Sequence, residues 1–176
     1  MHEVRLRLVE GRDIPSIGDI YREAVRFGSA SFELDPPSDE EMTRRMRGLV
    51  EGGFPYFVAT RGYEILGYAY AGPYRPRPAY RFTLEDSVYV AAHAQGTGLG
   101  RRLLGTLVAE SEKRGFRQMI AVIGDSANRA SIALHERAGF RHAGTLEAVG
   151  WKHGRWLDSV LMQRTLGPGN GTLPAE

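Results

Sequence analysis

A glycine-rich turn in the middle of the chain carries the clearest chemical signal. The sequence Gln95-Gly96-Thr97-Gly98-Leu99-Gly100 follows a strand-like run that ends at Val90, and it leads into a leucine-striped helix with Arg101 and Arg102 in its first turn. Glycines leave backbone N–H groups uncovered, so several of these groups can point at one phosphate. The positive end of the helix dipole adds to the attraction. The pattern therefore predicts a site for a phosphorylated ligand.

Two widespread phosphate-binding patterns do not match this turn. A Walker loop ends in Gly-Lys-Ser/Thr, whereas two arginines follow Gly100 and no hydroxyl is placed for magnesium. A dinucleotide-binding fold carries its glycines after the first strand of the unit, with an acidic residue about twenty positions later. Here the turn lies mid-chain. A plain tight turn before a helix stays open as the simplest interpretation.

Two arginines on a proline-rich segment are candidate ligands for an anionic group. Arg75 and Arg77 lie in the segment Pro73–Tyr80, where three prolines remove backbone donors and favour a stiff, extended loop. The guanidinium group binds carboxylates through two parallel hydrogen bonds. The segment therefore favours carboxylate recognition, and a solvated linker is the alternative because exposed arginine is common.

Hydrophobic periodicity predicts the elements that must position these groups. Apolar runs and alternations predict strands at 4–8, 56–59, 65–71, 83–90, 119–123 and 156–166. Helical spacing predicts helices that begin after Asp13, whose side chain can cap the first of them, after the capping box Ser38-x-x-Glu41, at Leu99 and after Asn128. The strand–helix–strand order around the Leu99 helix predicts that strands 83–90 and 119–123 run parallel. Between Gly139 and Trp156 the sequence predicts no element, only interruptions at Gly144 and Gly150.

Composition limits the class of protein. A chain of 176 residues with 42% apolar residues fits one domain over residues 1–166, and the glycine- and proline-rich tail 167–176 is expected to be disordered. The net charge is +2 and the basic residues are scattered, so we expect no nucleic-acid partner. The absence of cysteine excludes disulfides, thiolate metal sites and an acyl-cysteine intermediate. No apolar run approaches the ~20 residues of a membrane span, and MHEVRLRLVE lacks the apolar core of a signal peptide. A cytoplasmic protein without a membrane partner is expected.

The pattern from Arg5 to about Leu166 resembles the phosphinothricin and methionine sulfoximine N-acetyltransferase branch of the GNAT superfamily. The segments that carry the resemblance are Ser31–Glu33, Ala69–Pro73, Glu85–Val90, Gln95–Gly100, Ala121–Gly124, His135–Phe140 and Gly150–Trp156. The resemblance implies an α/β fold of the GNAT type. In this fold a mixed, mostly antiparallel sheet is splayed between strands 4 and 5 and flanked by helices. Acetyl-CoA is the implied co-substrate, with its pyrophosphate on the glycine turn, and no metal is implied.

The resemblance also implies roles for particular side chains. Glu85 would be the general base, and because an ordinary Glu titrates near ~4.3 it needs a raised pKa or a water relay. His135 would protonate the leaving sulfur or order a water, and a packing role is the alternative. Asn128 would contact the cofactor, or act as a plain helix cap. Backbone N–H groups near Val90 would polarise the thioester carbonyl. The implied cofactor-binding residues are Val88, Tyr89, Val90, Gln95, Gly96, Thr97, Gly98, Leu99, Gly100, Arg101, Asn128 and Ser131.

The acceptor implied by the resemblance is a small amino-acid-like molecule. The candidate acceptor residues are Phe32, Glu33, Arg75, Arg77, Lys152 and His153. Lys152 and His153 could act across the interface of a homodimer, which the resemblance suggests, or form a solvated hairpin tip. The expected reaction is direct acetyl transfer to the α-amine of phosphinothricin-like or methionine sulfoximine- or sulfone-like amino acids. Alternatives are another amine acceptor (a protein N-terminus, a polyamine or an aminoglycoside) and a CoA-binding module without catalysis.

Overall fold

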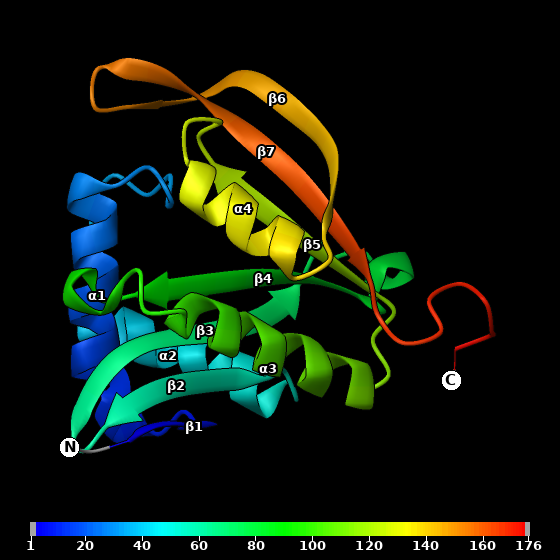
Figure 1. Cartoon of the computed structure of the whole chain (residues 1–176), viewed down its shortest axis with the longest axis horizontal. Helices are drawn as coiled ribbons and strands as arrows, with labels where there is room; N and C mark the ends of the chain where they lie inside the picture. The colour runs from blue at the N-terminus through cyan, green and yellow to red at the C-terminus, as the bar shows by residue number, and fades with distance from the viewer. Residues whose placement is uncertain (1–2, 175–176) are drawn as a thin grey trace.

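The computed structural model describes residues 3–174. Its strands are β1 (Val4–Leu8), β2 (Tyr56–Arg61), β3 (Glu64–Pro73), β4 (Thr83–Val90), β5 (Gln118–Gly124), β6 (Arg141–Lys152) and β7 (Arg155–Thr165). They form one sheet in the order β1-β2-β3-β4-β5-β7-β6 (Figure 1). β4 and β5 run parallel, and the other neighbouring strands are antiparallel. The predicted α/β fold with a mixed, mostly antiparallel sheet is confirmed.

Helices cover both faces of the sheet. They are α1 (Ile14–Phe27), α2 (Asp39–Glu51), α3 (Leu99–Lys113) and α4 (Arg129–Arg137), with short 3-10 turns η1 (Gly11–Asp13), η2 (Pro78–Tyr80) and η3 (Ala92–Ala94). In Figure 1, α3 and α4 lie in front of the sheet and α2 lies behind it. The leucine stripe of α3 is fully buried at Leu103 and Leu107 in one core cluster, whereas Ile17 of α1 and Met46 of α2 pack with Tyr68 in the other. Burial of these apolar stripes is the main stabilising contribution.

Local signals set the helix starts, with one correction. The Ser38 side chain accepts a hydrogen bond from the backbone N–H of Glu41, which is one half of the predicted capping box, whereas the Glu41 carboxylate accepts from Arg44 and Arg45. Asp13 precedes α1 directly, but its carboxylate does not cap the helix as predicted. It accepts two hydrogen bonds of 2.7 Å from Arg7 and one of 2.8 Å from the backbone N–H of Glu10. The reason is that η1 already gives Asp13 helical backbone angles, which turn its side chain toward β1.

Strand β6 occupies the segment for which the sequence predicts no element. Its residues are exposed along almost the whole length up to the buried Lys152. The register with β7 shifts between His142 and Gly144 and again between Leu146 and Gly150. Because β6 is exposed on both faces, its apolar and polar residues do not alternate. The register shifts also interrupt its period of two, so the sequence lacks the pattern of a half-buried strand. β6 forms because it pairs with β7, and the local sequence does not report that pairing.

The sheet opens between β4 and β5. The two strands pair from Thr83 to Asp86 of β4, where Asp86 lies opposite Ala121 of β5. Beyond this point β4 stays paired with β3 as far as Val90, and β5 stays paired with β7 as far as Gly124. The ends of β4 and β5 therefore diverge, as Figure 1 shows. The splay between strands 4 and 5 is confirmed.

The tail beyond β7 contacts the body of the molecule over its first residues. The Arg117 guanidinium donates hydrogen bonds to the carbonyl oxygens of Gly169 and Leu173 and to the hydroxyl of Thr172. Disorder of the tail 167–176 stays a prediction, and residues 175–176 lie outside the described residues. Within residues 3–174, no helix is long and apolar enough to cross a membrane.

Candidate active site

A cavity of about 990 Å³ lies where β4 and β5 diverge. One side consists of the end of β4, the glycine turn and the start of α3, and the other side includes α4 and the end of α1. Of the predicted cofactor residues, those that line the cavity are Val88, Tyr89, Val90, Gln95, Gly96, Gly98, Leu99, Gly100, Arg101, Asn128 and Ser131. Thr97 is not among the lining residues, and its hydroxyl donates to the Ala94 carbonyl.

The glycine turn has the backbone geometry of an anion site. Gly96 and Gly98 have φ angles of 73° and 81°, the left-handed region that favours glycine. Among the residues that the structure describes, no side chain caps α3 at Gly98, so the N–H groups of its first turn are available to a ligand. The Gln95 side-chain amide donates to the carbonyl of Val90 at 3.1 Å and ties the turn to β4. A phosphate group fits this cradle.

Several cavity residues had no signal in the sequence. They are Ile20, Glu23, Ala24 and Phe27 of α1, Gly28–Ala30 of the following loop, Asp125 and Ala127 after β5, Leu134 and Arg137 of α4, and Arg155 of β7. Arg155 donates to Asp125 at 2.5 Å, and Asp125 has a φ of 73°. The positive φ of a non-glycine residue marks this turn as strained. Nothing in a single sequence reveals such a φ angle.

Glu85 lies in the paired part of β4, half-buried on the face that α1 and α2 cover. Burial raises the pKa of the Glu85 carboxyl, the neighbouring charge of Asp86 raises it further, and Arg75 opposes the shift. Arg75 itself is exposed and lies over the ring of Tyr74 at 5.1 Å. A carboxyl with a raised pKa is better matched to accept a proton near neutral pH.

His135 lies on the opposite face of β4, beneath the start of the splay. Its Nε2 lies 3.0 Å from Oδ2 of Asp86, and its Nδ1 lies 2.7 Å from the backbone oxygen of Ser131. Burial disfavours the charged imidazole, but the hydrogen bond and charge of Asp86 outweigh this and raise the pKa of His135. Sequence reasoning missed Asp86, although its position one residue from Glu85 places it on the other face of the strand.

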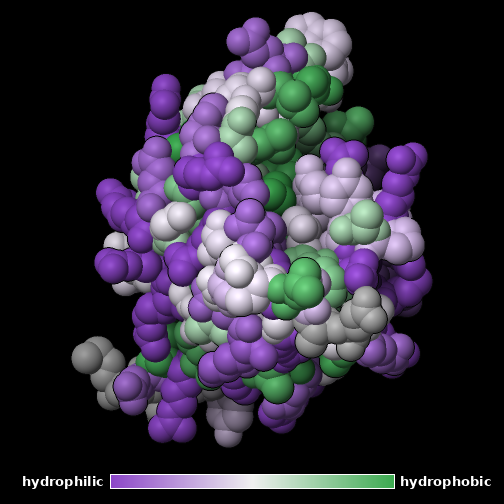
Figure 2. Space-filling view, turned by 90° about the vertical axis from the view of Figure 1, so that its right-hand side faces the viewer, coloured by the Kyte–Doolittle hydropathy of each residue, from purple (hydrophilic) through white to green (hydrophobic). Residues whose placement is uncertain are grey.

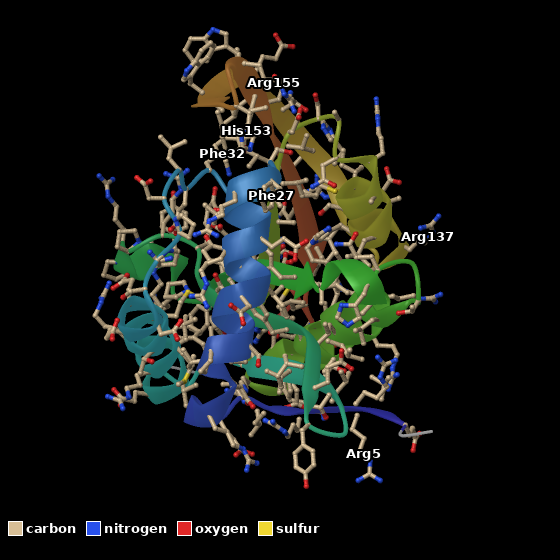
Figure 3. The ribbon with its side chains drawn as sticks, turned by 90° about the vertical axis from the view of Figure 1, so that its left-hand side faces the viewer. Arg5, Phe27, Phe32, Arg137, His153 and Arg155 are labelled. Atoms are coloured by element: carbon tan, nitrogen blue, oxygen red, sulfur yellow. The ribbon has the colours of Figure 1, made fainter. Side chains whose placement is uncertain are left out.

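Four of the six predicted acceptor residues gather at the loop between α1 and α2. Glu33 accepts from Arg45 at 2.6 Å, and Lys152 donates to the carbonyl of Ser31 at 2.7 Å. Burial lowers the pKa of the Lys152 ammonium, with Glu33 opposing the shift. His153 lies 3.2 Å from the carbonyl of Gly28. Figure 3 shows Phe32 and His153 near the C-terminal end of α1.

These contacts join the tip of the β6–β7 hairpin to the loop of the same chain. Arg75 and Arg77 belong to a separate segment before β4, where Arg77 is exposed and directly precedes η2. Within residues 3–174, no three His, Asp or Glu side chains lie close enough together to share a metal ion.

Comparison with known proteins shows to which family the chain belongs. The Acetyltransferase (GNAT) family matches residues 17–140. Phosphinothricin N-acetyltransferase of Alcaligenes faecalis is 55% identical over 96% of this chain and 86% of that protein. L-methionine sulfoximine/L-methionine sulfone acetyltransferase of Pseudomonas paraeruginosa is 40% identical over 89% of this chain and 91% of that protein. The crystal structure of a phosphinothricin acetyltransferase from Sinorhizobium meliloti, in complex with AcCoA, superposes with a TM-score of 0.95 at 48% identity and covers 98% of this chain and 94% of that one. The chain belongs to the GNAT acetyltransferase family, in its branch of phosphinothricin and methionine sulfoximine acetyltransferases.

Proposed function

We propose that this protein transfers the acetyl group of acetyl-CoA directly to the α-amine of phosphinothricin, methionine sulfoximine or methionine sulfone. The observation that carries the proposal is the cavity that runs from the glycine turn to the diverging ends of β4 and β5, together with the small adjoining pocket that His135 lines. The names of the relatives at 55% and 40% identity support the acceptors.

The residues of the cavity fit acetyl-CoA. The uncapped start of α3 and the left-handed glycines offer backbone donors for a pyrophosphate group. Arg101, Arg137 and Arg155 add positive charge along the walls. When bound, acetyl-CoA supplies the activated acyl group. Beyond Asp86, the backbone of β4 no longer pairs with β5, so its N–H groups toward the opening are available to polarise a carbonyl oxygen.

Glu85 acts as the general base, directly or through a water. The α-amine of the acceptor is protonated at neutral pH and must lose a proton before it can attack a carbonyl carbon. In the overall reaction a C–N bond forms and the C–S bond breaks. The acceptor ammonium loses two protons, of which the sulfur takes up one and solvent the other. His135 is the proton source for the sulfur.

The acceptor carboxylate binds to Arg75. The charge of Arg75 already acts on the carboxyl of Glu85, so the two side chains lie within electrostatic reach of each other. The loop that carries Phe32 and Glu33 closes the other side of the acceptor site. Arg77, Lys152 and His153 remain candidates, with Lys152 and His153 acting through the loop of their own chain because both contact it.

The protein acts as a homodimer that pairs through β6. This edge strand is twelve residues long and exposes Leu146, Val149 and Trp151, and Trp156 of β7 is exposed opposite Trp151. Figure 2 shows hydrophobic residues gathered at the level of the β6–β7 hairpin. A long, exposed, apolar edge strand favours pairing with another strand, and a second copy satisfies it.

Release of free CoA from acetyl-CoA by the purified protein tests the proposed function. Phosphinothricin, methionine sulfoximine and methionine sulfone are assayed in parallel with glutamate, methionine, spermidine, an aminoglycoside and a peptide with a free N-terminus. Turnover with the first three at least 10-fold above the others is expected. Faster turnover with the peptide, the polyamine or the aminoglycoside would assign a different acceptor, and binding of acetyl-CoA without turnover would indicate a binding module. The cytoplasmic location stays a prediction that cell fractionation checks.

A further inference from the structure

The hydrogen-bond partners of His135 determine its protonation. A backbone carbonyl oxygen can only accept, so Nδ1, at 2.7 Å from the oxygen of Ser131, has to carry a proton. The Ser131 hydroxyl lies farther from Nδ1, at 3.5 Å, and does not compete. The oxygens of an ionised carboxylate also only accept, so with Asp86 ionised Nε2, at 3.0 Å from its Oδ2, carries a proton as well. Both nitrogens donate only in the imidazolium form, which makes His135 and Asp86 an ion pair.

The pair is isolated from solvent. The side chains of His135 and Asp86 are 6% and 2% exposed. On α4 the backbone of Ser131 faces the imidazole ring, and the ring of Phe140 meets it edge-on at 5.1 Å between centroids. The charge that acts on His135 comes from Asp86 on β4, and the charges of Asp86 and Glu85, on the opposite face of that strand, interact with each other. Loss of the His135 charge would leave the Asp86 charge buried and unpaired, which is costly, so the pairing favours the imidazolium.

The second carboxylate oxygen of Asp86, Oδ1, can accept a further hydrogen bond. Among the described residues, no group donates a hydrogen bond to the buried Oδ1. Asp86 and His135 line a small pocket of about 50 Å³ between the diverging ends of β4 and β5. Val88, Asn128 and Ser131 line both this pocket and the large cavity. The pocket has room for a water, so Oδ1 can bind a donor that also reaches the inner end of the cavity.

We propose that Asp86 is a positioning residue that keeps His135 as an imidazolium in the small pocket that adjoins the cavity, where the pair supplies the proton taken up by the leaving sulfur. This inference rests on the proposed function. Transfer of the Nε2 proton to the thiolate breaks the hydrogen bond from Nε2 to Asp86 and leaves the Asp86 carboxylate and a neutral imidazole. The pair then regains one proton from solvent before the next turnover, so protons balance over the cycle.

Nuclear magnetic resonance on the intact protein tests the charge of His135 first. With 15N-labelled histidine, both ring nitrogens of His135 are expected to be protonated at pH 7, and the signal is assigned by its loss in His135→Gln. A single neutral tautomer at pH 7 overturns the proposal. This measurement uses the unmodified chain, so it shows the protonation state of His135 even if a variant at Asp86 does not fold.

The variant Asp86→Asn tests the positioning role. An amide accepts from Nε2 without a charge, so the pKa of His135 is expected to fall by about one unit or more. The alkaline limb of the pH profile of kcat moves to lower pH by the same amount. At neutral pH kcat falls about 10²-fold, while KM for acetyl-CoA stays within about twofold of the wild-type value. The control Asp19→Asn removes an exposed carboxylate of α1 and leaves both the titration and the limb in place.

Two results contradict the positioning role, namely an unchanged His135 titration in Asp86→Asn or an alkaline limb that does not move. Failure of the proposed function gives a different pattern. If the protein acetylates none of the acceptors, the function is wrong, whereas the resonance measurement still shows whether Asp86 holds His135 as an imidazolium.

Discussion

Two adjacent carboxylates on β4 face opposite sides of the sheet and sit in different chemical environments. Glu85 faces α1 and α2, is half-buried and has no hydrogen-bonded cation within residues 3–174, whereas Asp86 faces α4 and binds His135. The sequence and the family resemblance predicted Glu85 and His135 as site residues. Asp86 was missed because the partner of a histidine 49 residues away is a tertiary contact, which no local pattern reports.

The raised pKa of Glu85 predicts the acid limb of the activity profile. Glu85 must lose its proton to act as a base, so kcat/KM rises with pH through a pKa above the ordinary value of about 4.3. Glu85→Gln removes this limb and lowers kcat about 10² to 10³-fold, measured by CoA release from pH 4.5 to 9. An acid limb that persists in Glu85→Gln would assign the base elsewhere.

The raised pKa of His135 predicts how stability depends on pH. The folded state holds the His135 proton more tightly than the unfolded state, so the stabilisation is complete below about 6.5, the ordinary pKa, and is lost as pH rises through the folded-state pKa. Urea unfolding of the wild type and of His135→Gln should show the wild type losing more stability across this window. Parallel curves for the two proteins would contradict the ion pair.

The α1–α2 loop depends on glycines of other elements. A Cβ on Gly150 of β6 would lie 2.5 Å from the ring of Phe32, and a Cβ on Gly124 of β5 would overlap the backbone oxygen of Ser29. These close approaches explain why the loop can pack over the splay. The sequence identified Gly150 only as an interruption, because a glycine required by a distant loop looks like any other glycine.

Substitution of Gly124 by alanine tests this dependence. Gly124→Ala must displace the loop backbone, so we expect a loss of about 1–3 kcal/mol in urea unfolding and a raised KM for the amino-acid acceptor. Gly105→Ala is the matched control. Gly105 lies exposed within α3 with no atom near its missing Cβ, so alanine there stabilises by up to about 1 kcal/mol. Equal effects of both substitutions would show that the loop is free to move.

At the level of the whole molecule, the strands and helices with apolar stripes were predictable, and their assembly was not. Leu103 and Leu107 predicted α3 because they form the apolar face that α3 buries against the sheet. The pattern in Thr83–Val90 predicted β4 because one face of that strand is buried beneath the helices. The opening between β4 and β5 came from the family resemblance, since propensity and periodicity carry no information on where two strands part. Propensity and periodicity did not predict the edge strand β6, because most of its side chains are exposed.

The exposed β6 predicts a dimer that charge can dissociate. Trp151→Glu combined with Trp156→Glu places two carboxylates on the apolar hairpin, so we expect a shift from dimer to monomer in sedimentation velocity without loss of the fold by circular dichroism. Tyr63→Glu, at the fully exposed turn between β2 and β3, is the control and leaves the dimer intact. A wild-type protein that sediments as a monomer at all concentrations would rule out this interface.

The short pairing between β4 and β5 also bears on cooperativity. Four residue pairs join the half-sheet of β1 to β4 to the half-sheet of β5 to β7. Each half has longer internal ladders, so separation of the two is a smaller sub-global opening than the unfolding of either one. A ligand in the splay contacts both halves and opposes that opening. Amide hydrogen exchange at Glu85, Asp86 and Ile120 should therefore slow together on ligand binding, as one cooperative unit replaces two.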